Sequence, residues 1–218
     1  GKSAWSGAKT YTIPQEAQDV IALLDHLGLE KVAIIGTSRG GLIAMTLAAL
    51  AKVRLAGVCL VDIGPELSTD GLSVIQNYIG RNPVQKTYAE AVAMRATLLS
   101  GFKGVPESRW DAEVRKHYTE TADGLVINYD PALRDAVMAT ADQPMPDLWP
   151  LFEALTGLPL ALIRGANSDL LTRETATEMQ RRRPDIIFAD VPDRGHVPFL
   201  DEPQALDALS TWLERLAP

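Results

Sequence analysis

Ser38 lies in the pattern G-x-S-x-G at positions 36–40, after an apolar run and before a stretch rich in alanine and leucine. On a sharp strand-to-helix turn, this pattern strains the serine backbone and exposes its hydroxyl above the strand end. We expect Gly36 and Gly40 to be glycine because their backbones pass close together there. The helix that follows directs free N–H groups at the site, which predicts the Arg39 amide as an oxyanion donor. Ser38 is the candidate nucleophile.

A serine hydroxyl needs a base to become a good nucleophile, and histidine is the usual one. The chain has three histidines. We interpret His26 as a surface or packing residue of a helix that precedes the serine, and a structural role is favoured for His117. His196 lies in a loop after the last predicted strand, at the carboxyl edge that also presents Ser38. The sequence therefore predicts His196 as the general base.

A carboxylate should orient the imidazole and stabilise its charged form. Asp169 follows a predicted strand in the loop 165–169, again at the carboxyl edge. Asp62 ends its own strand at the same edge and is an alternative. We predict Asp169 as the acid of the triad and keep Asp62 as its rival.

The elements that must position these residues alternate between strand and helix. Apolar, β-rich runs predict strands at 31–36, 56–63, 158–164 and 186–191, and helical stretches lie at 15–27, 39–51, 173–182 and 203–216. This alternation with short connections is typical of a mostly parallel, doubly wound α/β sheet with helices on both faces.

The middle of the chain breaks this alternation. It shows helical periodicity, a turn signal at 122–124 and a proline-rich end at Pro144, Pro146 and Pro150. We predict a mostly helical cap or lid at 65–150, inserted between two parts of a core at 1–64 and 151–218. Some of its aromatic and methionine side chains would cover a pocket, and the others would hold the insertion together.

Three segments together resemble the catalytic segments of the α/β-hydrolase superfamily, in particular its capped esterase, lactonase and carbon–carbon hydrolase branch. They are G-T-S-R-G-G at 36–41, R-G-x-x-S-D at 164–169, and R-G-H-x-P at 194–198 with D-E-P at 201–203. The resemblance covers nearly the whole chain. It implies Ser38 as nucleophile, Asp169 as acid and His196 as base, in the chain order described for this fold.

Two features depart from the family pattern. G-K-S at 1–3 resembles the end of the R-G-x-G-x-S segment, and the early strands and the loop that supplies a second oxyanion donor do not appear in the sequence. We expect them upstream of Gly1, because an open sheet edge beside the nucleophile strand would favour aggregation; the alternatives are that another chain completes the sheet or that this fragment is inactive. Arg39 stands where an apolar or amide residue is usual. Its side chain either meets solvent or an acidic partner, or binds a substrate carboxylate. We predict Arg39 and Thr37, the residues on either side of Ser38, as candidate substrate-binding residues.

Composition limits the partners. The formal net charge is −7, which argues against a nucleic-acid surface. The single cysteine, Cys59, lies in an apolar run, which predicts a buried side chain. The sequence contains no span long and apolar enough for a bilayer and no signal pattern, so a cytoplasmic location is the default. No histidine or cysteine cluster has the spacing of metal ligands, and we expect neither a metal nor an organic cofactor.

The sequence therefore predicts a serine hydrolase acting on a small acyl substrate, an ester or a lactone, through an acyl-enzyme. One alternative is a binding protein that keeps the fold with little turnover, and another is a carbon–carbon bond hydrolase. A dinucleotide fold, with Asp62 binding a ribose, is disfavoured because Ser38 replaces the middle glycine of G-x-G-x-x-G. The oligomeric state is left open.

Overall fold

The computed structural model describes residues 3–141 and 143–216, which divide into two compact units. The core unit comprises Ile13–Gly71 and Met145–Pro218, and the insertion unit comprises Gly1–Thr12 and Leu72–Pro144. Residues 3–12, which we expected in the core, thus group with the insertion, while Gly1 and Lys2 of the G-K-S segment lie outside the described residues. The role of the insertion unit as a lid stays a prediction.

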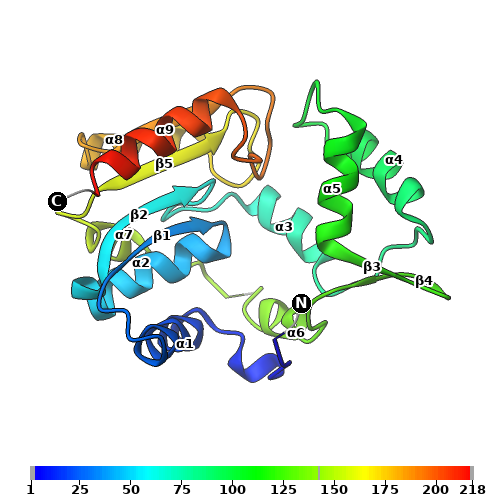
Figure 1. Cartoon of the computed structure of the whole chain (residues 1–218), viewed down its shortest axis with the longest axis horizontal. Helices are drawn as coiled ribbons and strands as arrows, with labels where there is room; N and C mark the ends of the chain where they lie inside the picture. Colours follow the sequence, from blue (N-terminus) through cyan, green and yellow to red (C-terminus); the bar gives the residue numbers. More distant parts are fainter. Residues whose placement is uncertain (1–2, 142, 217–218) are drawn as a thin grey trace. The chain divides into compact units, whose positions relative to one another are not determined.

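The core unit is built on a parallel sheet with the strand order β1-β2-β5-β6 (Figure 1). This arrangement, with helices between successive strands, confirms the predicted α/β class. The elements along the chain are α1 (Ile13–His26), β1 (Val32–Thr37), α2 (Arg39–Ala51), a 3-10 turn (Lys52–Arg54), β2 (Leu55–Val61), α7 (Trp149–Glu153), β5 (Leu160–Gly165), α8 (Arg173–Arg182), β6 (Ile187–Val191) and α9 (Pro203–Glu214).

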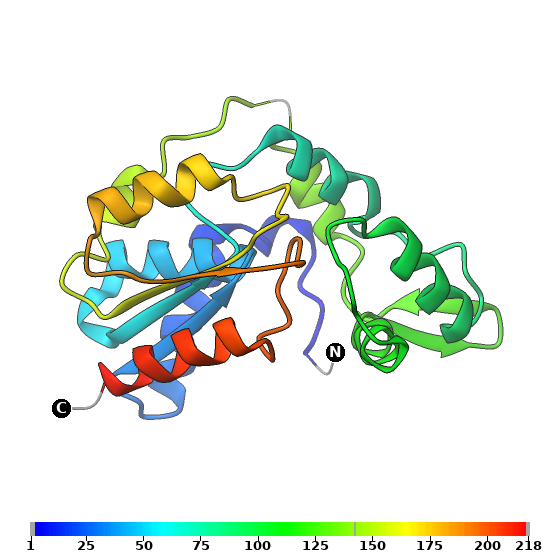
Figure 2. The ribbon, with the colours of Figure 1, turned by 90° about the horizontal axis from the view of Figure 1, so that it is seen from above.

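Both faces of the central strands β2 and β5 are covered, which explains why these strands are continuous apolar runs, whereas Ala33, Ile35 and Thr37 on one face of β1 are exposed. Figure 2 shows α8 and α9 on opposite sides of the sheet. One face packs against Ala205, Ala208 and Trp212 of α9, and contains Cys59 and Val61 among its buried side chains. Leu60, which alternates with them along β2, points to the opposite face, where a side chain at Gly41 of α2 would meet it.

The strand register brings four strand ends to one edge of the sheet. Thr37 pairs with Val61, Val61 pairs with Ile163, and Gly165 pairs with Val191. The residues that follow β1, β2, β5 and β6 therefore emerge side by side, at the edge where ligands bind in open α/β sheets.

Trp149 joins the two points at which the chain leaves the core unit and returns to it. Its indole N–H donates to Glu66 Oε1 at 2.7 Å. The same ring lies 3.8 Å from the guanidinium carbon of Arg182 and packs edge-on against Phe152. Glu66 belongs to the loop after β2, and Trp149 begins α7.

The insertion unit contains more β structure than the helical periodicity predicted. The turn signal at 122–124 connects the antiparallel strands β3 and β4, and Gly124 adopts a φ of 128° at this turn. The hydroxyl of Tyr11 donates to the carboxylate of Asp130 at 2.7 Å and ties the first residues of the chain to this unit. Its elements are a 3-10 turn (Ala8–Thr10), α3 (Thr69–Tyr78, which begins in the core unit), α4 (Tyr88–Leu98), α5 (Glu107–His117), β3 (Tyr118–Thr121), β4 (Gly124–Ile127) and α6 (Leu133–Met138).

Candidate active site

Ser38 occupies the turn between β1 and α2 with a φ of 49°, in the left-handed region that non-glycine residues rarely adopt. Its backbone N–H donates to the carbonyl of Val61 at 2.9 Å, which fixes the turn to the end of β2. A Cβ at Gly36 would lie 2.7 Å from the carbonyl oxygen of Gly40, so only glycine fits there. The strained serine conformation expected from the sequence is thus present.

The steric role of the second glycine falls one residue later than expected. A Cβ at Gly40 would meet no atom within 4 Å, whereas a Cβ at Gly41 would lie 2.3 Å from Ile63 Cγ2 and 3.0 Å from the carbonyl of Gly36. Successive residues of a helix point in different directions around its axis. Gly41 lies on the side of α2 that packs on the strands. The backbones of Gly36 and Gly40 do pass close together, as expected, but this approach requires glycine at position 36 and not at position 40. The second glycine that close packing requires is Gly41.

His196 lies between Ser38 and a buried carboxylate. Its Nε2 is 2.9 Å from Ser38 Oγ, and its Nδ1 is 2.6 Å from Asp62 Oδ2. A carboxylate only accepts hydrogen bonds, so Nδ1 carries the proton, and Nε2 of the neutral ring accepts from the serine hydroxyl. The side chain of Asp62 is fully buried and that of His196 is 13% exposed. This arrangement has the geometry of a serine–histidine–aspartate triad.

The carboxylate against His196 belongs to Asp62, and the expected partner, Asp169, is exposed. Asp62 has a φ of 53° and its N–H donates to the carbonyl of Ile163, so the chain turns sharply at the strand end. Its Oδ1 accepts from Gly165 N at 2.7 Å, and its Oδ2 accepts from Ser168 Oγ at 2.6 Å. These bonds compensate for burial of the charge, and the structure thus corrects our preference for Asp169.

Glu202 organises the loop that carries His196. It is buried, and its carboxylate accepts from Arg194 Nε at 2.7 Å and from the backbone N–H groups of Phe199 and Leu200 at 3.1 and 2.9 Å. The same loop approaches the end of β5 so closely that a Cβ at Gly165 would lie 2.4 Å from the carbonyl of Gly195. Glu202 and Gly165 lie within the segments that resemble the family's catalytic segments, but the residue pattern predicts no role for them, because neither contact is visible in it.

The guanidinium of Arg39 pairs with Glu16 of α1. Arg39 Nε and a terminal nitrogen each lie 2.8 Å from a different carboxylate oxygen. Glu16 is thus an acidic partner of Arg39, as one of our two interpretations expected. Its negative charge also compensates for the cation of Arg39 at the N-terminus of α2, where a positive charge is unfavourable. Thr37 is exposed at the end of β1. Substrate binding by Arg39 or Thr37 stays a prediction.

The other two histidines each lie at the end of a helix. His26 ends α1 with an exposed side chain, and His117 ends α5, where its Nδ1 is 2.7 Å from the carbonyl oxygen of Glu113 in its own helix. His26 thus has the surface position that we expected, and the structural role of His117 stays a prediction.

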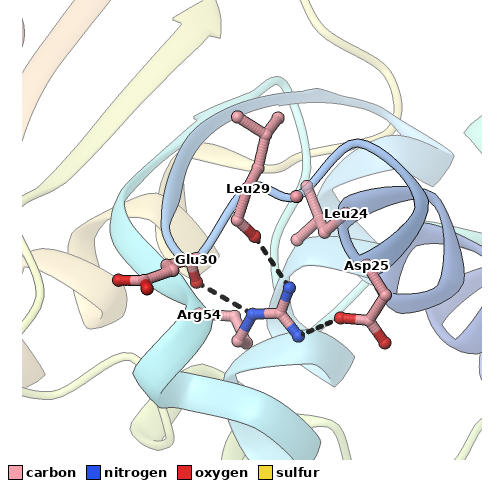
Figure 3. Close-up of a pocket in the computed structure, with 6 residues that line it drawn as sticks. Leu24, Asp25, Leu29, Glu30 and Arg54 are labelled. Carbon is pink, nitrogen blue, oxygen red and sulfur yellow. Dashed lines mark hydrogen bonds and ion pairs between the residues drawn. The ribbon is translucent and has the colours of Figure 1, made fainter.

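A surface pocket lies at the opposite edge of the sheet (Figure 3). Arg54 lies in it, and its guanidinium donates to the carbonyls of Leu29 and Glu30 and to the carboxylate of Asp25. The residues Glu30 and Arg54 precede β1 and β2, whereas Ser38 and Asp62 follow these strands. This pocket therefore lies at the sheet edge opposite to the triad and is not the candidate active site.

Within the described ranges 3–141 and 143–216, no group of three or more histidine, cysteine, aspartate or glutamate side chains is arranged to hold a metal ion. In the same residues, no helix combines the length and hydropathy needed to cross a membrane.

Known proteins resemble this chain along most of its length. The model of the alpha/beta hydrolase family matches residues 3–209. The 3-hydroxybutyrate-oligomer hydrolase of Cupriavidus necator is 36% identical over 213 residues, which are 93% of this chain and 72% of that protein. The 2-(acetamidomethylene)succinate hydrolase of Mesorhizobium japonicum is 25% identical over 187 residues, or 85% of this chain and 65% of that protein.

The solved structures give the same result. The crystal structure of an alpha/beta hydrolase from Novosphingobium aromaticivorans superposes with a TM-score of 0.89 at 34% identity, covering 99% of this chain and 76% of that one. The chain thus spans about two thirds to three quarters of the length of these relatives. The extent of the family match and the identity to these hydrolases show that the chain is an enzyme of the alpha/beta hydrolase family.

Proposed function

We propose that this chain hydrolyses a small carboxylic ester through an acyl-enzyme on Ser38, with His196 as general base and Asp62 as the acid of the triad. The observation that carries the proposal is the continuous hydrogen-bonded series from Ser38 Oγ through the imidazole to the buried carboxylate. A hydroxyl in this series loses its proton to the imidazole as it attacks, and the carboxylate stabilises the imidazolium that forms.

The reaction has two balanced halves. Ser38 Oγ bonds to the ester carbonyl carbon while its proton passes to His196 Nε2, and the same proton then goes to the leaving alkoxide as the carbon–oxygen bond breaks. Water next gives a proton to His196 and its oxygen attacks the acyl carbon, and the proton returns to Ser38 as the acid is released. The backbone N–H of Arg39, in the first turn of α2, is the proposed donor to the oxyanion in both halves.

The proposed substrate class is an ester of a short hydroxy acid. The support is the 36% identity to a protein named for hydrolysis of 3-hydroxybutyrate oligomers, in which hydroxy acids are joined by ester bonds. The alkoxide that leaves such an ester is a poor leaving group unless it is protonated as the carbon–oxygen bond breaks. A histidine that first removes and then returns a proton suits this chemistry.

The test is hydrolysis of the linear dimer of 3-hydroxybutyrate and of p-nitrophenyl butyrate by this chain and by its Ser38→Ala variant. We expect the variant to lose at least about a thousandfold in kcat, because nucleophile and base act as a unit. Circular dichroism of both proteins controls for folding. Equal turnover by the two proteins would contradict the acyl-enzyme. Binding of the dimer without hydrolysis of either ester would favour the alternative of a binding protein.

A further inference from the structure

Ser168 contacts the same carboxylate oxygen as the imidazole. Its Oγ lies 2.6 Å from Asp62 Oδ2, and His196 Nδ1 lies 2.6 Å from that oxygen. Ser168 Oγ also accepts from the backbone N–H groups of Leu170 and Leu171 at 3.2 and 3.1 Å. Because these two N–H groups occupy its acceptor positions, the hydroxyl hydrogen is directed to the carboxylate, which can only accept.

The backbone of this loop is held on both sides, so the hydroxyl has a fixed position. Ser168 N donates to the carbonyl of Gly165, and Asn167 N donates to the carbonyl of Arg194 in the loop that carries His196, each at 2.9 Å. Buried Arg164 donates from Nε to the carbonyl of Leu171 at 2.8 Å and pairs with Asp190 at 2.9 Å. The loop after β5 thus connects the ends of β2 and β6 at the triad.

We propose that Ser168 is a positioning residue that holds the Asp62 carboxylate in line with His196, an inference that rests on the proposed function. A buried carboxylate with a second donor on the oxygen that faces the imidazole has less freedom to rotate away from it. Ser168 acts only through Asp62 and contacts no reacting atom. The R-G-x-x-S-D segment therefore supplies the triad with a hydroxyl, whereas we expected it to supply an acid.

The experiment compares Ser168→Ala, Ser168→Thr and the double variant with Asp62→Asn, using p-nitrophenyl butyrate. We expect Ser168→Ala to lower kcat about tenfold, the effect of one hydrogen bond to a charged group, with KM changed less than about twofold. Ser168→Thr keeps a hydroxyl and should recover most of this loss. In the Asp62→Asn background, Ser168→Ala should cost less than about twofold more, because the carboxylate on which it acts is gone.

A tenfold loss that persists in the Asp62→Asn background would overturn the inference, since it would reflect a general effect on the loop. Full activity of Ser168→Ala would also overturn it, while Ser38→Ala in the same assay reports separately on the proposed function. If Ser168→Ala does not fold, Ser168→Cys keeps the size with a weaker donor, and its unchanged kcat would be equally decisive against the inference.

Discussion

Two loops at the carboxyl edge of the sheet each contain an aspartate, and only one of these aspartates meets the imidazole. The loop after β2 buries Asp62 completely and surrounds its carboxylate with hydrogen-bond donors from the loop after β5 and from His196. The loop after β5 exposes Asp169 and turns the hydroxyl of Ser168 inward. Position at the sheet edge therefore leaves both aspartates as candidates, and burial with complete hydrogen bonding distinguishes Asp62 from Asp169.

The largest expected effect comes from changing the two aspartates in turn. Asp62→Asn should lower kcat by about 10⁴-fold, the order found when a triad aspartate becomes an amide. The amide oxygen can still accept from Gly165 N, which leaves an NH₂ group facing His196 Nδ1. The imidazole then loses the acceptor that keeps its proton on Nδ1. Steady-state hydrolysis of p-nitrophenyl butyrate measures the loss.

Asp169→Asn is the matched control, with the same chemical change at an exposed site. We expect its kcat to stay within about twofold of the original chain. If instead Asp169→Asn lost the activity and Asp62→Asn kept it, the assignment from geometry would be wrong and the family pattern at 164–169 would hold for this chain.

The next effect concerns the close approach of the two catalytic loops. Gly165→Ala would place a Cβ 2.4 Å from the Gly195 carbonyl and 2.6 Å from that of Arg194, so the loop carrying His196 must shift. We expect a loss of about 2–3 kcal/mol in the free energy of unfolding, together with lower kcat. Gly40→Ala is the control, because its Cβ meets nothing within 4 Å and alanine is the better helix former.

Urea unfolding of both glycine variants measures the difference. A Gly165→Ala chain as stable and active as the original would show that the two loops can separate at little cost, and the glycine of the R-G-x-x-S-D segment would need another explanation. A destabilised Gly40→Ala chain would restore the original expectation for the turn at Ser38.

The smallest effect concerns a second buried group on β2. Cys59 lies among the apolar side chains packed by α9, and burial raises the pKa of its thiol from 9.0 to about 12. The thiol therefore stays protonated when folded and ionises more readily when unfolded, so stability should fall as the pH rises from 9 towards 12. Ellman's reagent should not label the folded chain at pH 8 and should label it fully in urea. Rapid labelling of the folded chain would contradict this burial.

The sequence predicted the elements of the core well, because long apolar runs that alternate with amphipathic stretches leave few other arrangements. The runs at 56–63 and 158–164 are β2 and β5, neighbours at the centre of the sheet. The hairpin of the insertion unit was missed. Its strand β3 is short and mostly exposed, so it lacks the apolar run by which a strand is identified.

The sequence placed the serine and the histidine of the candidate site together, because the loop positions of both follow from the strand order. The acid was not, since Asp62 and Asp169 both follow strands at the same edge. The choice depends on backbone direction within single turns, such as the positive φ at Asp62. Residue types do not specify this direction, because aspartate tolerates such a conformation without requiring it.

The hydrogen bond between Trp149 and Glu66 bears on which changes of sequence length this protein tolerates. Since Glu66 and Trp149 hold the outgoing and returning chain together beside the sheet, the two ends of the intervening stretch are already closed on each other. Lengthening such a loop adds little entropic cost, because the cost of closing it grows only slowly with its length. Insertions in the segment between these residues should therefore cost little stability, provided that the hydrogen bonds from Ser68 N to the Leu170 carbonyl and from Tyr11 to Asp130 are kept.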